Sequence, residues 1–163
     1  MHVVLLEPEI PMNTGNIGRT CAATSTSLHL IRPLGFDIDE KAVRRAGMDY
    51  WPLVNLHVYD DFADFMKKTS PARLYLATTK ARRLYTEPAY GPDDWLLFGK
   101  ESAGLPEELL LAYHETAIRI PMLDELRSLN LANSVAIVLY EALRQQGFPG
   151  LRREGELHRL KWD

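Results

Sequence analysis

Three polar segments, each directly after a short apolar run, contain the residues whose types and spacing could do chemistry. They are residues 7–19, 98–106 and 119–134. In an open parallel sheet, ligands bind beyond the carboxyl ends of the strands, where loops supply backbone donors. Glycine and proline fix the path of such loops and let the backbone approach a ligand closely. The three segments together therefore predict a binding site built from several strand ends.

Taken singly, the same residues also have structural interpretations. Asn13 and Asn130 are suitable helix N-caps, and Arg19 could form a surface ion pair on the helix that follows the first segment. Cys21 is typical of a small buried hydrophobe. At this point both interpretations remain open.

Several well-known catalytic motifs are missing from the sequence. It has no H-E-x-x-H metal motif and no G-x-S-x-G nucleophile motif. Gly99-Lys100 is followed by Glu101, where a phosphate-binding P-loop needs Ser or Thr. Residues 15–18 form G-x-x-G and not the G-x-G-x-x-G of a dinucleotide fold. Metal-dependent hydrolysis, nucleotide hydrolysis and hydride transfer are therefore poorly supported.

The elements that must position these segments alternate along the chain. Short apolar runs are separated by helical patterns, which predicts an α/β fold with a mostly parallel sheet flanked by helices. The predicted strands are 3–6, 28–31, 53–59, 73–78, 95–98 and 117–120. The predicted helices are 13–26, 37–47, 60–69, 106–113 and 130–146. We expect a single domain over residues 1–163, with an irregular tail from about residue 148.

The last predicted helix is apolar around most of its circumference. Such a helix must be buried on more than one side. In a chain of 163 residues, a second subunit is a natural way to bury the extra face. The pattern therefore predicts a homodimer.

Composition restricts the class of protein further. The chain is 46% hydrophobic, has one cysteine and has no apolar run near the roughly 20 residues of a membrane helix. A lone Cys21 predicts a reducing, cytoplasmic location. The formal charge of −3 is not typical of a protein that wraps nucleic acid, although residues 67–83 hold six basic and no acidic side chains. That stretch is either a basic binding face or ordinary solvated surface.

Taken in order, the three segments resemble the three motifs of the SpoU branch of the SPOUT RNA methyltransferases. The first motif matches Asn13-Thr14-Gly15-Asn16-Ile17-Gly18-Arg19, and the second matches residues 98–106, F-G-K-E-S-A-G-L-P. The third matches R-I-P-M at 119–122 and R-S-L-N-L-A-N at 127–133. Residues 7–11, 44–50 and 78–80 look like those of the small tRNA wobble-nucleotide 2'-O-methyltransferases of this branch. The resemblance extends to about Gly150.

The resemblance implies a deep trefoil knot, a homodimer and S-adenosylmethionine as methyl donor, with S-adenosylhomocysteine as product and no metal. It places the catalytic role on Arg19, with Asn13, Glu101 and Asn130 arranging the site. The cofactor contacts that it implies are Ala77, Thr78, Gly99, Gly104, Ile120, Met122, Ser128 and Leu129. Arginine has a pKa above roughly 12, so we expect Arg19 to orient groups and stabilise charge rather than act as a general base.

The substrate that the resemblance implies is the ribose 2'-hydroxyl of the wobble cytidine or uridine, position 34, in the tRNA anticodon loop. Basic side chains would bind its phosphates, and Tyr85 or Trp51 could stack on a base. The candidate basic residues are Arg44, Arg45, Lys80, Arg82 and Arg83. Two alternatives remain: a SpoU-type enzyme that acts on another tRNA position or on rRNA, and a non-catalytic RNA- or nucleotide-binding module.

Overall fold

The computed structural model describes residues 1–38 and 50–162. The predicted helix 37–47 extends into the segment 39–49, and the candidate RNA contacts Arg44 and Arg45 belong to it. The predicted helix beyond residue 38 and the candidate contacts Arg44 and Arg45 therefore lie outside the described residues.

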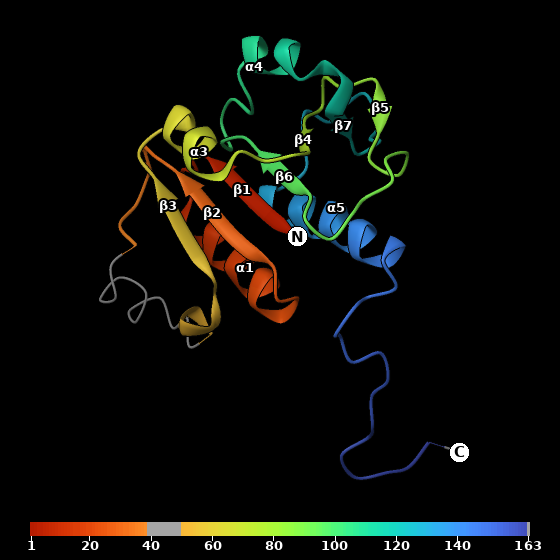
Figure 1. Cartoon of the computed structure of the whole chain (residues 1–163). Helices are drawn as coiled ribbons and strands as arrows, with labels where there is room; N and C mark the ends of the chain where they lie inside the picture. Colours follow the sequence, from red (N-terminus) through yellow and green to blue (C-terminus); the bar gives the residue numbers. More distant parts are fainter. Residues whose placement is uncertain (39–49, 163) are drawn as a thin grey trace.

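The centre of the molecule is a seven-stranded sheet in which the paired strands are all parallel. Its order is β3-β2-β1-β6-β4-β7-β5, so β1 lies between strands from the two halves of the chain (Figure 1). The strands are β1 (His2–Leu6), β2 (Ser27–Ile31), β3 (Leu56–Tyr59), β4 (Leu74–Ala77), β5 (Arg83–Leu84), β6 (Trp95–Phe98) and β7 (Ala117–Arg119). The predicted α/β class with a parallel sheet is confirmed.

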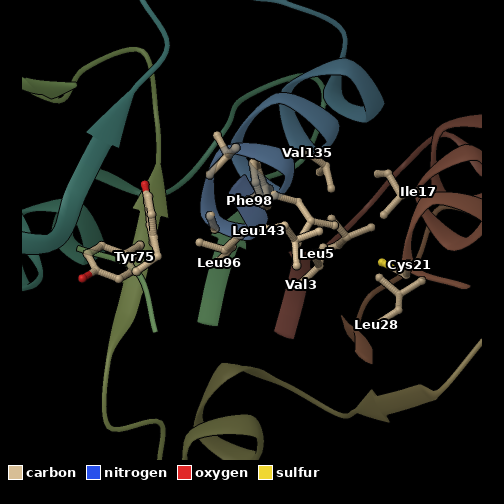
Figure 2. Packing of buried hydrophobic residues seen from close by; sticks show 14 of the residues in the cluster. Val3, Leu5, Ile17, Cys21, Leu28, Tyr75, Leu96, Phe98, Val135 and Leu143 are labelled. Atoms are coloured by element: carbon tan, nitrogen blue, oxygen red, sulfur yellow. The ribbon is translucent and has the colours of Figure 1, made fainter. Parts of the chain in front are cut away.

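Both faces of the sheet are buried, which explains why its strands read as continuous apolar runs. Successive side chains of a strand point to opposite faces. Val3 and Leu5 accordingly pack with one hydrophobic cluster, whereas Val4 and Leu6 pack with another. The first cluster also holds Phe98 and residues of α1 and α5 (Figure 2).

Within the described residues, four α-helices cover the two faces and make a three-layered structure. Helices α1 and α5 contribute to the first cluster, and α3 and α4 to the second. Their bounds are α1 (Pro11–Ala23), α3 (Phe62–Thr69), α4 (Glu107–Ala112) and α5 (Leu131–Gln145), with short 3-10 helices at Trp51–Leu53 and His114–Thr116. Residues 146–162 contain no helix or strand and lead away from the layered body (Figure 1). None of the helices described here is long and apolar enough to cross a membrane.

Two sequence predictions need correction, and one strand was not predicted. Helix α1 begins at Pro11, whose fixed φ suits a first helical turn, and not at Asn13. The predicted strand 53–59 is only β3, because Trp51–Leu53 forms a 3-10 helix before it. The two-residue strand β5 was not predicted, since two residues carry no period that a sequence pattern can show.

A histidine cluster lies on the α3 side of the sheet. His29 is 3% exposed, with its Nε2 atom 3.0 Å from His2 Nδ1 and its Nδ1 atom 2.9 Å from the Tyr59 hydroxyl. A neutral imidazole can donate at one nitrogen and accept at the other, which matches two such partners. Burial, followed by the charges of His57 and His2, lowers the pKa of His29 to about 3.

We expect the free energy of unfolding to fall as the pH is lowered from 7 to 5, and to fall less in a His29→Phe variant. In the unfolded chain, histidine binds a proton below its ordinary pKa of about 6.5, whereas folded His29 stays neutral until about pH 3. The contribution of His29 to the free energy of unfolding is therefore fully present above pH 6.5. It is lost as the pH falls from 6.5 toward 3, at up to about 1.4 kcal/mol per pH unit. Urea unfolding at pH 7 and 5 measures this, with His158→Phe in the exposed tail as the control. An unchanged pH dependence in His29→Phe would contradict it.

Candidate active site

A cavity of about 460 Å³ opens at the carboxyl ends of β4, β6 and β7. This volume lies in the roughly 300–1,000 Å³ range of small-molecule sites. The position is the one expected for ligands of parallel sheets, beyond the strand ends. All eight predicted cofactor contacts line it: Ala77, Thr78, Gly99, Gly104, Ile120, Met122, Ser128 and Leu129. The structure thus brings together residues from all three motif segments and from the end of β4.

The wall formed by residues 99–105 requires glycine at two places. A Cβ atom on Gly99 would lie 2.1 Å from the carbonyl carbon of Gly104, so the two stretches of backbone are in direct contact. Gly104 itself has a φ of +68°, which disfavours other residues. Because both positions are glycine, no side chain separates this stretch of main chain from a ligand in the cavity. A backbone wall of this kind fits the close main-chain contacts expected for the adenine of S-adenosylmethionine.

Three of the predicted site residues form one hydrogen-bonded row on the rim of the cavity. The Asn13 amide donates to Glu101 Oε1 over 3.0 Å, and the Asn130 amide donates to Asn13 Oδ1 over 3.0 Å. The Asn130 side chain also accepts hydrogen bonds from the backbone N–H groups of Ala132 and Asn133, which confirms it as the N-cap of α5. Asn13 is not an N-cap: it lies inside α1, is 6% exposed and connects the other two residues.

Glu101 works as an acceptor for the loop before α1. Its carboxylate accepts the backbone N–H of Glu9 over 2.8 Å and that of Ile10 over 3.2 Å, in addition to the Asn13 amide. Three donors from the first motif segment thus converge on one carboxylate of the second motif segment. We therefore interpret Glu101 as a residue that positions the loop.

A second contact, which the motifs do not predict, joins the same two loops in the opposite direction. The Glu9 carboxylate accepts hydrogen bonds from the Ser102 backbone N–H over 2.9 Å and the Ser102 hydroxyl over 2.8 Å. These bonds lower the pKa of Glu9. Lys100 Nζ also lies 2.9 Å from Glu7 Oε2. The signal was available in principle, because β1 and β6 are neighbours and their following loops must meet.

Arg19 does not line the cavity. It lies on α1, is exposed, and its Cζ atom is 4.5 Å from the centroid of the Tyr50 ring. Among the described residues Arg19 makes no ion pair. Cys21 is buried, as expected of a small hydrophobe, and burial raises its pKa to about 12.

Most basic side chains of residues 67–83 are engaged in ion pairs with carboxylates of the same chain. Four of the six basic side chains form ion pairs: Lys68–Asp64, Arg73–Asp94, Lys80–Glu107 and Arg83–Glu87. Lys80 lines the cavity, and Arg82 is exposed two residues further on. The two candidate stacking rings, Tyr85 and Trp51, are half-buried and pack against the core.

A model of the SpoU rRNA methylase family matches residues 1–140. The chain belongs to this family. Residues from all three motifs of this SpoU methylase line the cavity, whereas Arg19 of the first motif lies outside it. The trefoil knot that the resemblance implies remains a prediction.

Relatives of this SpoU methylase match it almost from end to end. A Yersinia pestis tRNA (cytidine(34)-2'-O)-methyltransferase is 49% identical, over 92% of this chain and 96% of its own. A Geobacillus stearothermophilus protein with the same name, given provisionally, is 51% identical over 93% of this chain and 98% of its own.

Solved structures of methyltransferases are similar to this chain over most of its length. One that describes 2-OH methylation of C/U34 on tRNA has a TM-score of 0.83 and 46% identity, covering 90% of this chain and 95% of its own. An AdoMet-bound rRNA methyltransferase from Sinorhizobium meliloti has a TM-score of 0.74 and 27% identity, covering 88% of this chain and 55% of its own. Within residues 1–38 and 50–162, no group of three or more His, Cys, Asp or Glu residues is arranged to hold a metal ion.

Proposed function

We propose that this SpoU methylase transfers a methyl group from S-adenosylmethionine to the ribose 2'-hydroxyl of the wobble nucleotide, cytidine or uridine 34, of tRNA. The observation that carries the proposal is the row Glu101–Asn13–Asn130 on the rim of a cavity lined by all the predicted cofactor contacts. The near full-length similarity to proteins that act on nucleotide 34 supports the choice of substrate. Because tRNA is the proposed substrate, we place its activity in the cytoplasm.

The cavity residues would hold the cofactor mostly through backbone. Gly99 and Gly104 let the main chain come close, and Ile120 and Met122 offer apolar surface beside it. When bound, S-adenosylmethionine supplies an electrophilic methyl group on a sulfonium that is a good leaving group. The chain then has two tasks, to align the ribose hydroxyl and to help its proton depart.

Arg19 is the group that we assign to the hydroxyl and its neighbouring phosphate. A guanidinium stays protonated and presents several donors in one plane, so it can orient an oxygen and stabilise developing negative charge. Asn13, Glu101 and Asn130 would fix the start of α1, the helix on which Arg19 lies. The hydroxyl proton would leave to phosphate or water rather than to Arg19.

We further propose that Arg82 contacts the phosphate backbone of the anticodon arm together with Arg44, Arg45, Lys80 and Arg83. We expect Arg82→Ala to weaken tRNA binding at low salt and to reduce the slope of log affinity against log salt by about 1. Binding titrations over a salt series measure this. Lys67→Ala is the matched control: Lys67 is exposed and without an ion pair among the described residues, but its helix, α3, lines no part of the cavity. Equal effects of the two variants would contradict the assignment.

We also propose that the protein is a homodimer. Helix α5 buries one face, including Val135 and Leu139, yet leaves Ile137 36% and Tyr140 45% exposed. A second copy would cover this extra apolar face. We expect a dimer mass by light scattering, and a shift toward monomer in Ile137→Asp. A monomeric parent protein would contradict the proposal.

The function is tested by incubating the protein with methyl-labelled S-adenosylmethionine and unmodified bulk tRNA, followed by digestion and mapping of the label. We expect a 2'-O-methyl nucleoside at position 34. Label only in ribosomal RNA, or at another tRNA position, would overturn the choice of substrate and keep the reaction. Cofactor binding without transfer to any RNA would favour the binding-module alternative.

A further inference from the structure

Tyr50 contacts α1 at two points one helical turn apart. Its hydroxyl donates a hydrogen bond to the Gly15 carbonyl oxygen over 2.7 Å, and its ring lies under the guanidinium of Arg19. Positions 15 and 19 are four residues apart and therefore lie on the same helix face. The aromatic ring is thus fixed at its hydroxyl end and presents its face to the cation.

The next residue strengthens this contact. Trp51 packs so closely on α1 that a Cβ atom on Gly18 would come within 2.7 Å of Trp51 Cζ3. Tyr50 and Trp51 therefore both contact α1 between Gly15 and Arg19. The Trp51 contact fixes the position of the neighbouring Tyr50 backbone relative to the helix. The ring position is set by the fold and does not depend on a bound substrate.

We propose that Tyr50 is a positioning residue that orients the Arg19 guanidinium through cation–π contact with its ring. The inference rests on the proposed role of Arg19 in the transfer. An exposed arginine samples many rotamers, and a contact over an aromatic face restricts them without using its N–H donors. The donors thus stay available for the ribose hydroxyl and a phosphate.

The ring, and not the hydroxyl, is expected to matter for catalysis. We expect Tyr50→Leu to lower kcat about 2- to 5-fold, the size of one exposed cation–π contact, with the KM for tRNA and the affinity for S-adenosylmethionine changed less than about 2-fold. Tyr50→Phe keeps the ring and should retain at least about half of kcat. Rescue by phenylalanine separates loss of the ring face from loss of the Gly15 hydrogen bond.

A double-mutant cycle tests whether Tyr50 acts through Arg19. In an Arg19→Ala background, Tyr50→Leu should cause no further loss of kcat, since residues that act through one contact are not additive. The Arg19 side-chain Nε–H resonance, read by NMR, should be shifted by the ring in the parent and in Tyr50→Phe, and should move in Tyr50→Leu. This readout does not depend on activity or on stability.

The outcomes separate the inference from the proposed function. Unchanged kcat in Tyr50→Leu together with a large loss in Arg19→Ala overturns the inference alone. Additive losses in the double variant, or an Nε–H resonance that ignores the ring, also overturn it. Unchanged kcat in Arg19→Ala overturns the role of Arg19 and the inference with it.

Discussion

Replacing Arg19 by alanine should lower kcat on the order of 100-fold or more and leave the affinity for S-adenosylmethionine nearly unchanged. The reason is geometric: Arg19 lies on α1, outside the residues that line the cavity, so its loss removes no cofactor contact. What is lost is the group that orients the ribose hydroxyl and offsets its developing charge. Single-turnover rates with saturating tRNA, together with calorimetry of cofactor binding, measure the two quantities separately.

Arg19→Lys is the informative companion variant. Lysine keeps the positive charge but loses the planar fork of donors, so we expect partial activity between the parent and the alanine variant. A normal single-turnover rate in Arg19→Ala with weakened cofactor binding would contradict the assignment. In that case Arg19 would be a cofactor-binding residue and not a residue that acts on the ribose hydroxyl.

Replacing Glu101 by alanine should also lower kcat on the order of 100-fold, because a displacement of about 1 Å in a reacting group can cost that much. The Glu101 carboxylate accepts hydrogen bonds from Glu9, Ile10 and Asn13, and Asn13 leads on to Asn130 at the start of α5. Without it, three donors lose their acceptor and the loop before α1 is released. The heat stability of the protein should fall as well.

Although Glu101→Gln keeps the size of the side chain, we expect its kcat to be closer to that of Glu101→Ala than to that of the parent protein. One of its two terminal atoms becomes an NH₂ group, which would face an N–H donor instead of accepting from it. Steady-state kinetics of Glu101→Ala, Glu101→Gln and the exposed control Glu108→Ala on α4 test this. Near-parental kcat in Glu101→Gln would show that the converging hydrogen bonds do not organise the site.

The strands that build the sheet could be predicted from the sequence because they are buried on both faces. Val3 to Leu6 form an unbroken apolar run, and the structure places alternate members in the two hydrophobic clusters. Helix α1 was predicted to start too late because Asn13 has the chemistry of an N-cap, whereas its amide is used by Glu101 and Asn130. A polar residue that serves a tertiary network looks the same in sequence as one that serves its own helix.

The motifs predicted the residues that line the cavity together, but not the placement of Arg19 outside it or the contacts between the loops. The three motifs predicted that Glu101, Asn13 and Asn130 lie in one site, and the structure shows the hydrogen bonds between them. The Glu9–Ser102 contact and the Tyr50–Arg19 contact join residues that no local spacing relates. Only the packing of neighbouring loops and of Trp51 on α1 reveals such pairs.

The most direct test of the account compares three synthetic anticodon stem-loops with methyl-labelled S-adenosylmethionine. One has all its ribose hydroxyls, one lacks the 2'-hydroxyl at nucleotide 34 only, and one lacks it at nucleotide 33 only. We predict label in the first and third and none in the second, because the oxygen at nucleotide 34 is the proposed acceptor. Label in the stem-loop without the 2'-hydroxyl at nucleotide 34 would contradict the account.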